Sequence, residues 1–171
     1  MDENEIKNKD IITPDRLRSF VFGVEDSLVS TVGLLSGIAI VGTPGKTIFL
    51  TGIILIFVEG LSMGVGNYLS EYSANSLLQK KEVSIVGPLT NGIIMFISYV
   101  AAGFIPLLPY LFTKPEEGLP ISIIASLTFL FILGIFGSRL AKTPLWRGGL
   151  RMMIFGGLAI SLGVIIGRIM A

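Results

Sequence analysis

Two residue types with distinctive chemistry are missing from this sequence, which has no cysteine and no histidine. Without cysteine it can form no disulfide, zinc–thiolate or iron–sulfur centre. Without histidine it lacks the commonest transition-metal ligand and the commonest general base. The spacing of its other residues offers no nucleophile–base pair, so we expect no enzymatic activity and no bound cofactor. A metal ion could bind only through oxygen, thioether sulfur or the backbone.

Charge is also scarce, whereas apolar residues are abundant. Only 15% of the 171 residues are charged and 51% are hydrophobic, and the mean hydropathy is +0.80. A soluble domain of this size could not cover so much apolar surface, but a protein that crosses a membrane several times needs no such cover. We therefore expect a lipid bilayer around this chain and no nucleic-acid partner.

Five segments are long and apolar enough to span a membrane, which takes roughly 20 residues. They cover residues 20–41, 46–70, 86–112, 119–140 and 150–170. The sequence thus predicts an all-α, polytopic membrane protein in which residues 20–171 form one five-helix transmembrane domain. In the third segment, Pro106 and Pro109 are expected to kink or end the helix.

Residues 1–19 are polar and mix acidic with basic side chains. We interpret them as a solvated cytoplasmic tail that ends in an interfacial turn after Pro14. They do not show the basic stretch followed by a short apolar run that marks a cleavable signal peptide.

The basic residues predict the orientation in the membrane, because cytoplasmic loops carry an excess of lysine and arginine. With the N-terminus inside and the C-terminus outside, three of the 13 basic residues lie outside, namely Lys46, Lys114 and Arg168. The other ten then lie on the cytoplasmic side: Lys7, Lys9, Arg16, Arg18, Lys80, Lys81, Arg139, Lys142, Arg147 and Arg151.

Small residues at helical spacing predict where the spans pack closely against one another. Such residues recur in four of the five spans: Ser30, Gly33 and Gly37; Gly60 and Gly64; Gly134 and Ser138; and Gly156, Gly163 and Gly167. The pattern favours a compact bundle.

Ionisable residues inside the spans are the main functional signal, because they are costly in hydrocarbon. In the second span Glu59, Met63, Asn67 and Glu71 recur every four residues, which aligns them on one slowly drifting helix face. In the first span Asp26 shares a face with Ser30, Gly33 and Gly37. Its neighbour Glu25 points about 100° away and is expected to serve only the entrance to the site.

This donor set suits a divalent transition metal. Carboxylate and amide oxygens bind hard and borderline cations, and a thioether favours Fe²⁺ or Mn²⁺ over Mg²⁺ and Ca²⁺. Carboxylates removed from water also compete for protons, so binding of a cation would displace protons. That coupling is the basis of cation/proton antiport.

Structural explanations stay open for several of these residues. Met63 could be ordinary packing, and Asn67 an interhelical hydrogen bond. Glu71 could be solvated, and Glu25 could reach the interface or pair with Arg16 or Arg18. Asp26 and Glu59 are the hardest to explain without a function.

The same segments resemble the vacuolar iron transporter family, which includes nodulin-like proteins. The resemblance covers nearly the whole chain after residue 19. It is carried by GVEDSLVSTVGLLSGIA, EGLSMGVGNYLSEYSA, PLTNGIIMFISYVAAGFIPLLPYLF and the stretch from FLFILGIFGSRL to GVIIGRIM. The most specific pieces are the Asp-Ser pair of the first span, the Ser-Met-Gly run followed by Gly-x-Tyr-x-Ser, and Pro-Leu-x-Pro-Tyr. Arg-Met and Gly-Arg in the last span add to them.

The resemblance implies a homodimer whose transport path lies at the subunit interface, lined by the first and second spans. It implies export of Fe²⁺ or Mn²⁺ from the cytosol in exchange for protons. Asp26 and Met63 match the family's intramembrane metal-path aspartate and methionine. Ser62, Gly64 and Tyr68 match the motif around them.

The sequence departs from the family pattern in three ways. The connection at 71–85 is too short for the glutamate-rich metal-binding domain of eukaryotic members. Asn67 stands where the family usually has glutamate, and Glu71 could partly substitute for it. Glu25 and Glu59 stand where small or neutral residues are common, and either add charge to the path or shift its preference among metals.

Together these observations predict a divalent-metal transporter, which we expect in a prokaryotic cell membrane. The expected metal ligands are Asp26, Glu59, Met63, Asn67, Glu25 and Glu71. Two alternatives remain, namely a small exporter of organic cations in exchange for protons and a membrane scaffold that transports nothing.

Overall fold

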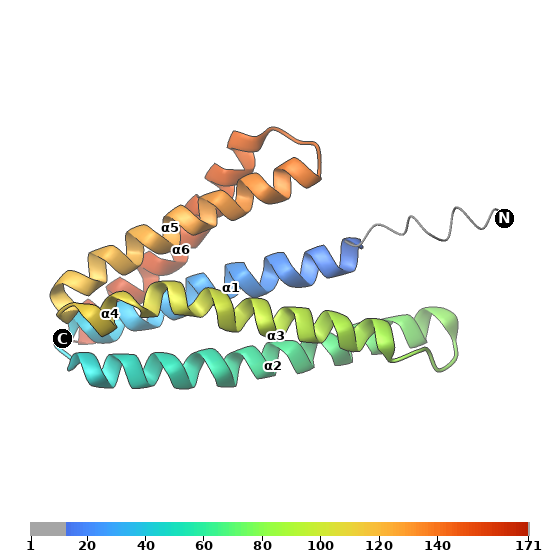
Figure 1. The fold of residues 1–171 in the computed structure, drawn as a ribbon, viewed down its shortest axis with the longest axis horizontal. Helices are drawn as coiled ribbons and strands as arrows, with labels where there is room; N and C mark the ends of the chain where they lie inside the picture. Colours follow the sequence, from blue (N-terminus) through green and yellow to red (C-terminus); the bar gives the residue numbers. More distant parts are fainter. Residues whose placement is uncertain (1–12, 171) are drawn as a thin grey trace.

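A computed structural model describes residues 13–170, in which every regular element is an α-helix. The helices are α1 (Pro14–Ile40), α2 (Gly45–Gln79), α3 (Val86–Leu107), α4 (Pro109–Phe112), α5 (Pro115–Leu140) and α6 (Leu145–Met170) (Figure 1). All except α4 are long and apolar enough to cross a membrane. The predicted all-α architecture with five membrane-spanning helices is therefore confirmed.

The first helix begins earlier than the hydropathy predicts. It starts at Pro14, where the missing N–H of proline is no disadvantage. The side chain of Thr13 caps it by accepting a hydrogen bond from the backbone N–H of Arg16 at 3.4 Å. Residues 14–19 are thus helical, and the rest of the expected tail, 1–12, lies outside the described residues.

The second helix continues past the apolar stretch to Gln79. No glycine or proline interrupts residues 71–79, and the helix ends where Lys80 adopts a left-handed conformation, with φ 50°. Helices α5 and α6 likewise begin several residues before the segments expected at 119 and 150. Hydropathy marks the edge of the hydrocarbon, whereas a helix ends where capping or backbone conformation ends it.

The two prolines divide the third apolar segment. Helix α3 ends at Leu107 with Pro106 in its last turn, and Pro109 begins the short helix α4. The carbonyl of Pro106 accepts a hydrogen bond from Ser122 Oγ of α5 at 2.7 Å. The expectation that these prolines kink or end the helix is confirmed.

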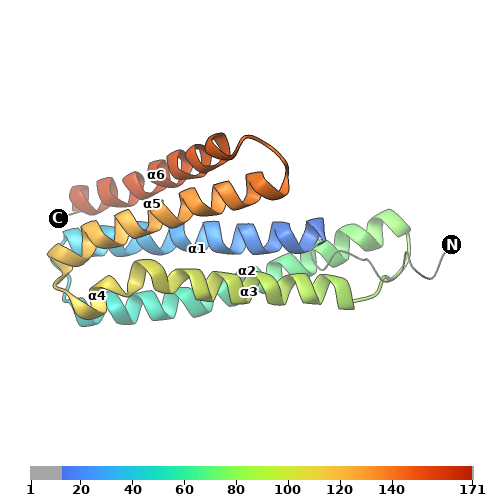
Figure 2. The same ribbon diagram turned by 45° about the horizontal axis from the view of Figure 1, so that its top comes forward.

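Helix α1 is the centre of the bundle. It packs against α3 and α6 most extensively, and also against α5 and α2. In Figure 2, α5 and α6 lie on one side of α1, whereas α2 and α3 lie on its other side. The fully buried side chains of α1 are Ser19, Ser27, Leu28, Thr31, Val32, Leu35 and Ser36.

The small-residue faces are where the helices approach most closely. A Cβ added to Gly64 of α2 would lie 2.9 Å from the carbonyl oxygen of Gly92 in α3. A Cβ on Gly163 of α6 would collide with the backbone of Gly33 in α1, and one on Gly134 of α5 with Gly148 in α6. These contacts confirm the packing role predicted for the small residues.

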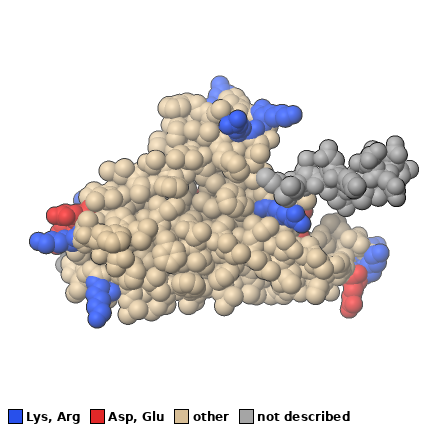
Figure 3. Space-filling model, in the orientation of Figure 1, with Lys and Arg blue, Asp and Glu red and all other residues tan. Residues whose placement is uncertain are grey.

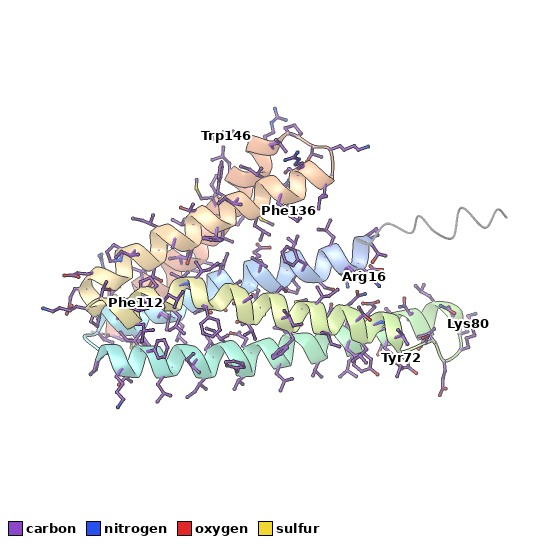
Figure 4. The ribbon with its side chains drawn as sticks, in the orientation of Figure 1. Arg16, Tyr72, Lys80, Phe112, Phe136 and Trp146 are labelled. Carbon is purple, nitrogen blue, oxygen red and sulfur yellow. The ribbon has the colours of Figure 1, made fainter. Side chains whose placement is uncertain are left out.

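On the face that Figure 3 shows, charged side chains lie toward the two ends and at the α5–α6 turn, and the band between them is almost free of charge. Arg16, Tyr72 and Lys80 lie toward one end, whereas Phe112 lies at the other (Figure 4). Helix α1 begins and α6 ends at opposite ends (Figure 1), as five spans require.

The basic residues divide unequally between these ends. Three described basic residues, Lys46, Lys114 and Arg168, lie on the side of the α1–α2 and α4–α5 connections. The other eight lie on the side of the α2–α3 and α5–α6 connections: Arg16, Arg18, Lys80, Lys81, Arg139, Lys142, Arg147 and Arg151. Lys7 and Lys9 are outside the described residues, and the cytoplasmic assignment of the basic end stays a prediction.

Candidate functional site

Asp26 and Glu59 bring two carboxylates together inside the bundle. Asp26 comes from the middle of α1 and Glu59 from the middle of α2, and both side chains are half-buried. They are close enough to repel each other electrostatically, and Glu25 adds a smaller repulsion on Asp26. Among the described residues, Asp26 has neither a hydrogen bond nor a cationic partner. The charge that would balance this pair must come from a proton, a cation or another molecule.

A tyrosine from α3 completes this centre. The hydroxyl of Tyr99 donates to Glu59 Oε2 at 2.6 Å, and it lies 2.7 Å from Ser30 Oγ of α1. The carbonyl oxygen of Tyr99 also accepts a hydrogen bond from Ser27 Oγ at 2.6 Å. Three helices are thus joined by hydrogen bonds beside the carboxylates.

Met63 lies one turn further along α2 and opens onto a cavity of about 660 Å³. Residues from α1, α2 and α3 line it, with two thioethers among them: Arg18, Phe22, Ser62, Met63, Gly66, Asn67, Ser70 and Met95. Sulfur and oxygen donors therefore face one space, and it begins about one helical turn from the two carboxylates, which do not line it themselves. Arg18, near the start of α1, gives this cavity a cationic group as well.

Asn67 lines the same cavity but also holds two helices together. Its Nδ2 donates to Ser19 Oγ of α1 at 3.0 Å, and Ser19 is fully buried. The interhelical hydrogen bond considered for Asn67 is thus present. The amide oxygen remains the only group of this side chain that could bind a cation.

Glu71 is held by α3 and is not simply solvated. Asn91 Nδ2 donates to both of its carboxylate oxygens, at 2.9 Å and 2.8 Å. Asn91 is 5% exposed, so this contact joins α2 to α3 beyond the cavity. Among the described residues, Glu71 belongs to no group of three or more acidic side chains.

Glu25 faces another part of the molecule. It lines a cavity of about 470 Å³ between α1 and the α5–α6 pair, together with Ser138, Thr143 and Arg151. The structure therefore separates Glu25 from Met63 and Asn67, as the 100° rotation between neighbouring residues predicts.

The six predicted ligands lie in different parts of one chain, and their role as metal ligands stays a prediction. Within residues 13–170, no three acidic side chains lie close enough together to hold a metal ion. The structure instead groups Asp26 with Glu59 and places Met63 and Asn67 in the adjoining cavity. Tyr99 and Met95 were not predicted from the sequence. The only available signal was that a tyrosine in an apolar span needs a partner for its hydroxyl.

Comparison with known sequences identifies the family. The sequence pattern of the VIT family matches residues 17–85 and 77–168. This chain belongs to the VIT family. The matched regions contain all six predicted ligands, and Tyr99 as well. The resemblance seen in the sequence is therefore confirmed.

Several plant proteins are similar to this chain. Vacuolar iron transporter homolog 2 of Arabidopsis thaliana is 28% identical over 155 residues, which cover 85% of this chain and 79% of that protein. Vacuolar iron transporter homolog 4 of the same plant is 27% identical over 157 residues, with the same coverage. Vacuolar iron transporter homolog 2 of Oryza sativa subsp. japonica is 24% identical over 172 residues, covering 91% of this chain and 90% of that protein.

Proposed function

We propose that this VIT family protein exports Fe²⁺, and also Mn²⁺, from the cytosol in exchange for protons. The observation that carries the proposal is the pair of half-buried carboxylates, Asp26 and Glu59, which has no cationic partner among the described residues. Two such groups at mid-membrane are stable only when a proton or a cation lies with them. A site that exchanges one for the other would couple the two fluxes.

The chemistry of the neighbouring donors supports a transition metal. Carboxylate oxygens from Asp26 and Glu59 stand beside a cavity with the thioethers of Met63 and Met95. Thioether sulfur is a poor ligand for Mg²⁺ and Ca²⁺ and a better one for later divalent metals. The names of the plant relatives, which refer to iron transport, support the same cargo.

The residue that contacts Glu59 directly gives little support to an organic cation. An aromatic ring face beside the carboxylate would favour such a ligand. Tyr99, the aromatic residue that Glu59 contacts, is fully buried and presents its hydroxyl to the carboxylate. Its ring face is occupied by packing.

The proposed path lies between two copies of this chain, along α1 and α2. Within residues 13–170, no third acidic side chain joins Asp26 and Glu59 in a metal-binding group, and two carboxylates are few for a divalent ion that prefers several oxygen ligands. A second copy facing the first would add its own Asp26 and Glu59. The proposal therefore uses a homodimer to complete the ligand set.

We further propose that the basic end of the molecule faces the cytosol of a prokaryotic cell, with the protein in the plasma membrane. The eight basic residues described at that end support this orientation. The plant relatives are named for the vacuole. Transport into a vacuole and transport out of a prokaryotic cell both remove the ion from the cytosol.

Transport by purified protein in liposomes tests the proposal. The liposomes carry a dye that Fe²⁺ quenches, and a pH gradient is imposed across the membrane. We expect Fe²⁺ flux that depends on the gradient and falls roughly tenfold or more in Asp26→Ala, since losing a charged ligand costs more than about 1.4 kcal/mol. Glu116→Gln is the matched control, because Glu116 is exposed at the start of α5. The proposal fails if there is no flux, or if Asp26→Ala behaves like this control.

A further inference from the structure

Tyr99 of α3 forms hydrogen bonds to both α1 and α2 beside the carboxylate pair. It is 0% exposed, yet its hydroxyl and its carbonyl contact Glu59, Ser30 and Ser27 at 2.6–2.7 Å. Elsewhere in the described chain the structure gives Glu59 no other hydrogen bond and no ion pair. The orientation of the Glu59 carboxylate is therefore fixed by a single hydroxyl.

The hydroxyl of Tyr99 can bridge two polar groups at once. A tyrosine hydroxyl has one hydrogen to donate and can also accept. Tyr99 donates to Glu59 Oε2, so it can accept from Ser30 Oγ, which lies 2.7 Å away. The two contacts fix the hydroxyl between α1 and α2 at the level of the carboxylate.

The backbone of α2 is built to admit this ring next to Glu59. The neighbouring residue is Gly60, and a Cβ added there would lie 3.2 Å from Cδ1 of Tyr99 and 3.3 Å from Cγ2 of Val100. Gly60 is buried. The absence of a side chain at this position lets the tyrosine approach the helix at the level of the carboxylate.

We propose that Tyr99 is the positioning residue of Glu59. It holds Oε2 of the carboxylate through one hydrogen bond and leaves Oε1 free for the metal ion. The proposal rests on the transport function proposed above and adds the group that orients its second carboxylate. Tyr99 itself does not touch the ion.

Removing the hydroxyl alone tests this role. In Tyr99→Phe we expect the dissociation constant for Mn²⁺, measured by calorimetry in detergent, to rise about tenfold, which corresponds to about 1.4 kcal/mol. The KM for Mn²⁺ transport in liposomes should rise by a similar factor, with a smaller change in the maximal rate. Tyr110→Phe is the matched control, because Tyr110 is also buried, at 3% exposed, but packs with Leu35 and Leu107 in an apolar cluster.

Two further measurements separate positioning from a general structural role. In a Glu59→Gln background, Tyr99→Phe should add little, because the carboxylate that it positions is gone. Ser30→Ala keeps the ring and removes only its second hydrogen bond, so it should weaken Mn²⁺ binding in the same direction by a smaller factor. Melting temperatures of Tyr99→Phe and Tyr110→Phe should be similar.

Three results would overturn the inference. The first is equal Mn²⁺ binding by the Tyr99→Phe and Tyr110→Phe variants. The second is an effect of Tyr99→Phe that is just as large in the Glu59→Gln background. The third is a lower melting temperature of Tyr99→Phe that accounts for its weaker binding, together with unchanged binding by Ser30→Ala. Failure of the proposed function is distinguishable, since the unmodified protein would then neither bind nor transport Mn²⁺.

Discussion

Three acidic side chains of α1 and α2 differ in the number of hydrogen bonds that their carboxylates accept. Glu71 accepts two hydrogen bonds from Asn91, Glu59 accepts one from Tyr99, and Asp26 has none among the described residues. A carboxylate whose oxygens are already bonded gains little from a metal ion, whereas an unsatisfied one gains much. The order in which these residues should bind a cation is therefore Asp26, Glu59 and then Glu71.

The thioether of Met63 should set the preference among metals. Met63→Leu keeps a similar volume and removes the sulfur, so we expect the protein to fold and the preference for Fe²⁺ and Mn²⁺ over Mg²⁺ to fall several-fold. Competition between these ions in the liposome assay measures the change. Met153→Leu is the control, since Met153 lies in an apolar groove with Ile123 and Leu127. Unchanged selectivity in Met63→Leu would make this side chain ordinary packing.

At the residue scale, the sequence was most informative for ionisable side chains inside apolar spans, because these are costly in hydrocarbon. Asp26 and Glu59 stand out in apolar spans, and helical spacing alone links Glu59 with Met63. The bridge from Glu59 to Tyr99 could not be predicted, because it joins residues 40 positions apart and depends on the rotation of α3. The same holds for Asn91, which contacts Glu71 only because α3 returns beside α2.

Helices α2 and α3 contact each other through a pair of glycines, and a hydrogen-bonded pair of side chains lies on either side of this glycine contact. Gly64 meets Gly92, while Glu59–Tyr99 lies on one side of this crossing and Glu71–Asn91 on the other. A larger residue at the crossing would separate the helices and stretch both hydrogen-bonded pairs. The packing of α2 on α3 thus positions the site.

Gly64→Ala tests this arrangement. The added Cβ would lie 2.9 Å from the carbonyl oxygen of Gly92 and 3.0 Å from Cβ of Phe96, so we expect a loss of about 1–3 kcal/mol of stability. A lower melting temperature in detergent would show it. Gly66→Ala, two residues away, meets nothing within 4 Å and should be neutral or slightly stabilising. Equal melting temperatures for the two variants would contradict the close packing.

At the element scale, hydropathy located every span but misplaced several ends. The polar residues at 71–79 were expected in a connection and are helical, because helix formation there is opposed by neither glycine nor proline. The prolines at 106 and 109 were expected to kink or end the third helix, and α3 ends at Leu107 between them, since proline changes backbone hydrogen bonding directly. Backbone chemistry therefore predicted boundaries better than polarity did.

At the scale of the whole molecule, the proposed homodimer needs one face that carries both α1 and α2. The cavity beside Asp26 and Glu59 is lined by exposed residues of α1 and α2, including Phe22 and Ser62. The opposite side of the bundle is formed by α5 and α6 (Figure 2). If two chains share the transport path, their contact must run along α1 and α2.

Cysteine crosslinking can test this contact directly, because the natural chain has no cysteine to remove. With a short bismaleimide added to membranes, Ser62→Cys should give a covalent dimer on a denaturing gel. Ser161→Cys is the matched control, since Ser161 is an exposed serine on α6. Added Mn²⁺ should protect the thiol of the Ser62→Cys variant from the reagent, because a bound ion lies beside that position in the shared path. A dimer formed by the Ser161→Cys variant alone would move the interface to α6, and the ligand set could then not be completed by Asp26 and Glu59 of a second chain.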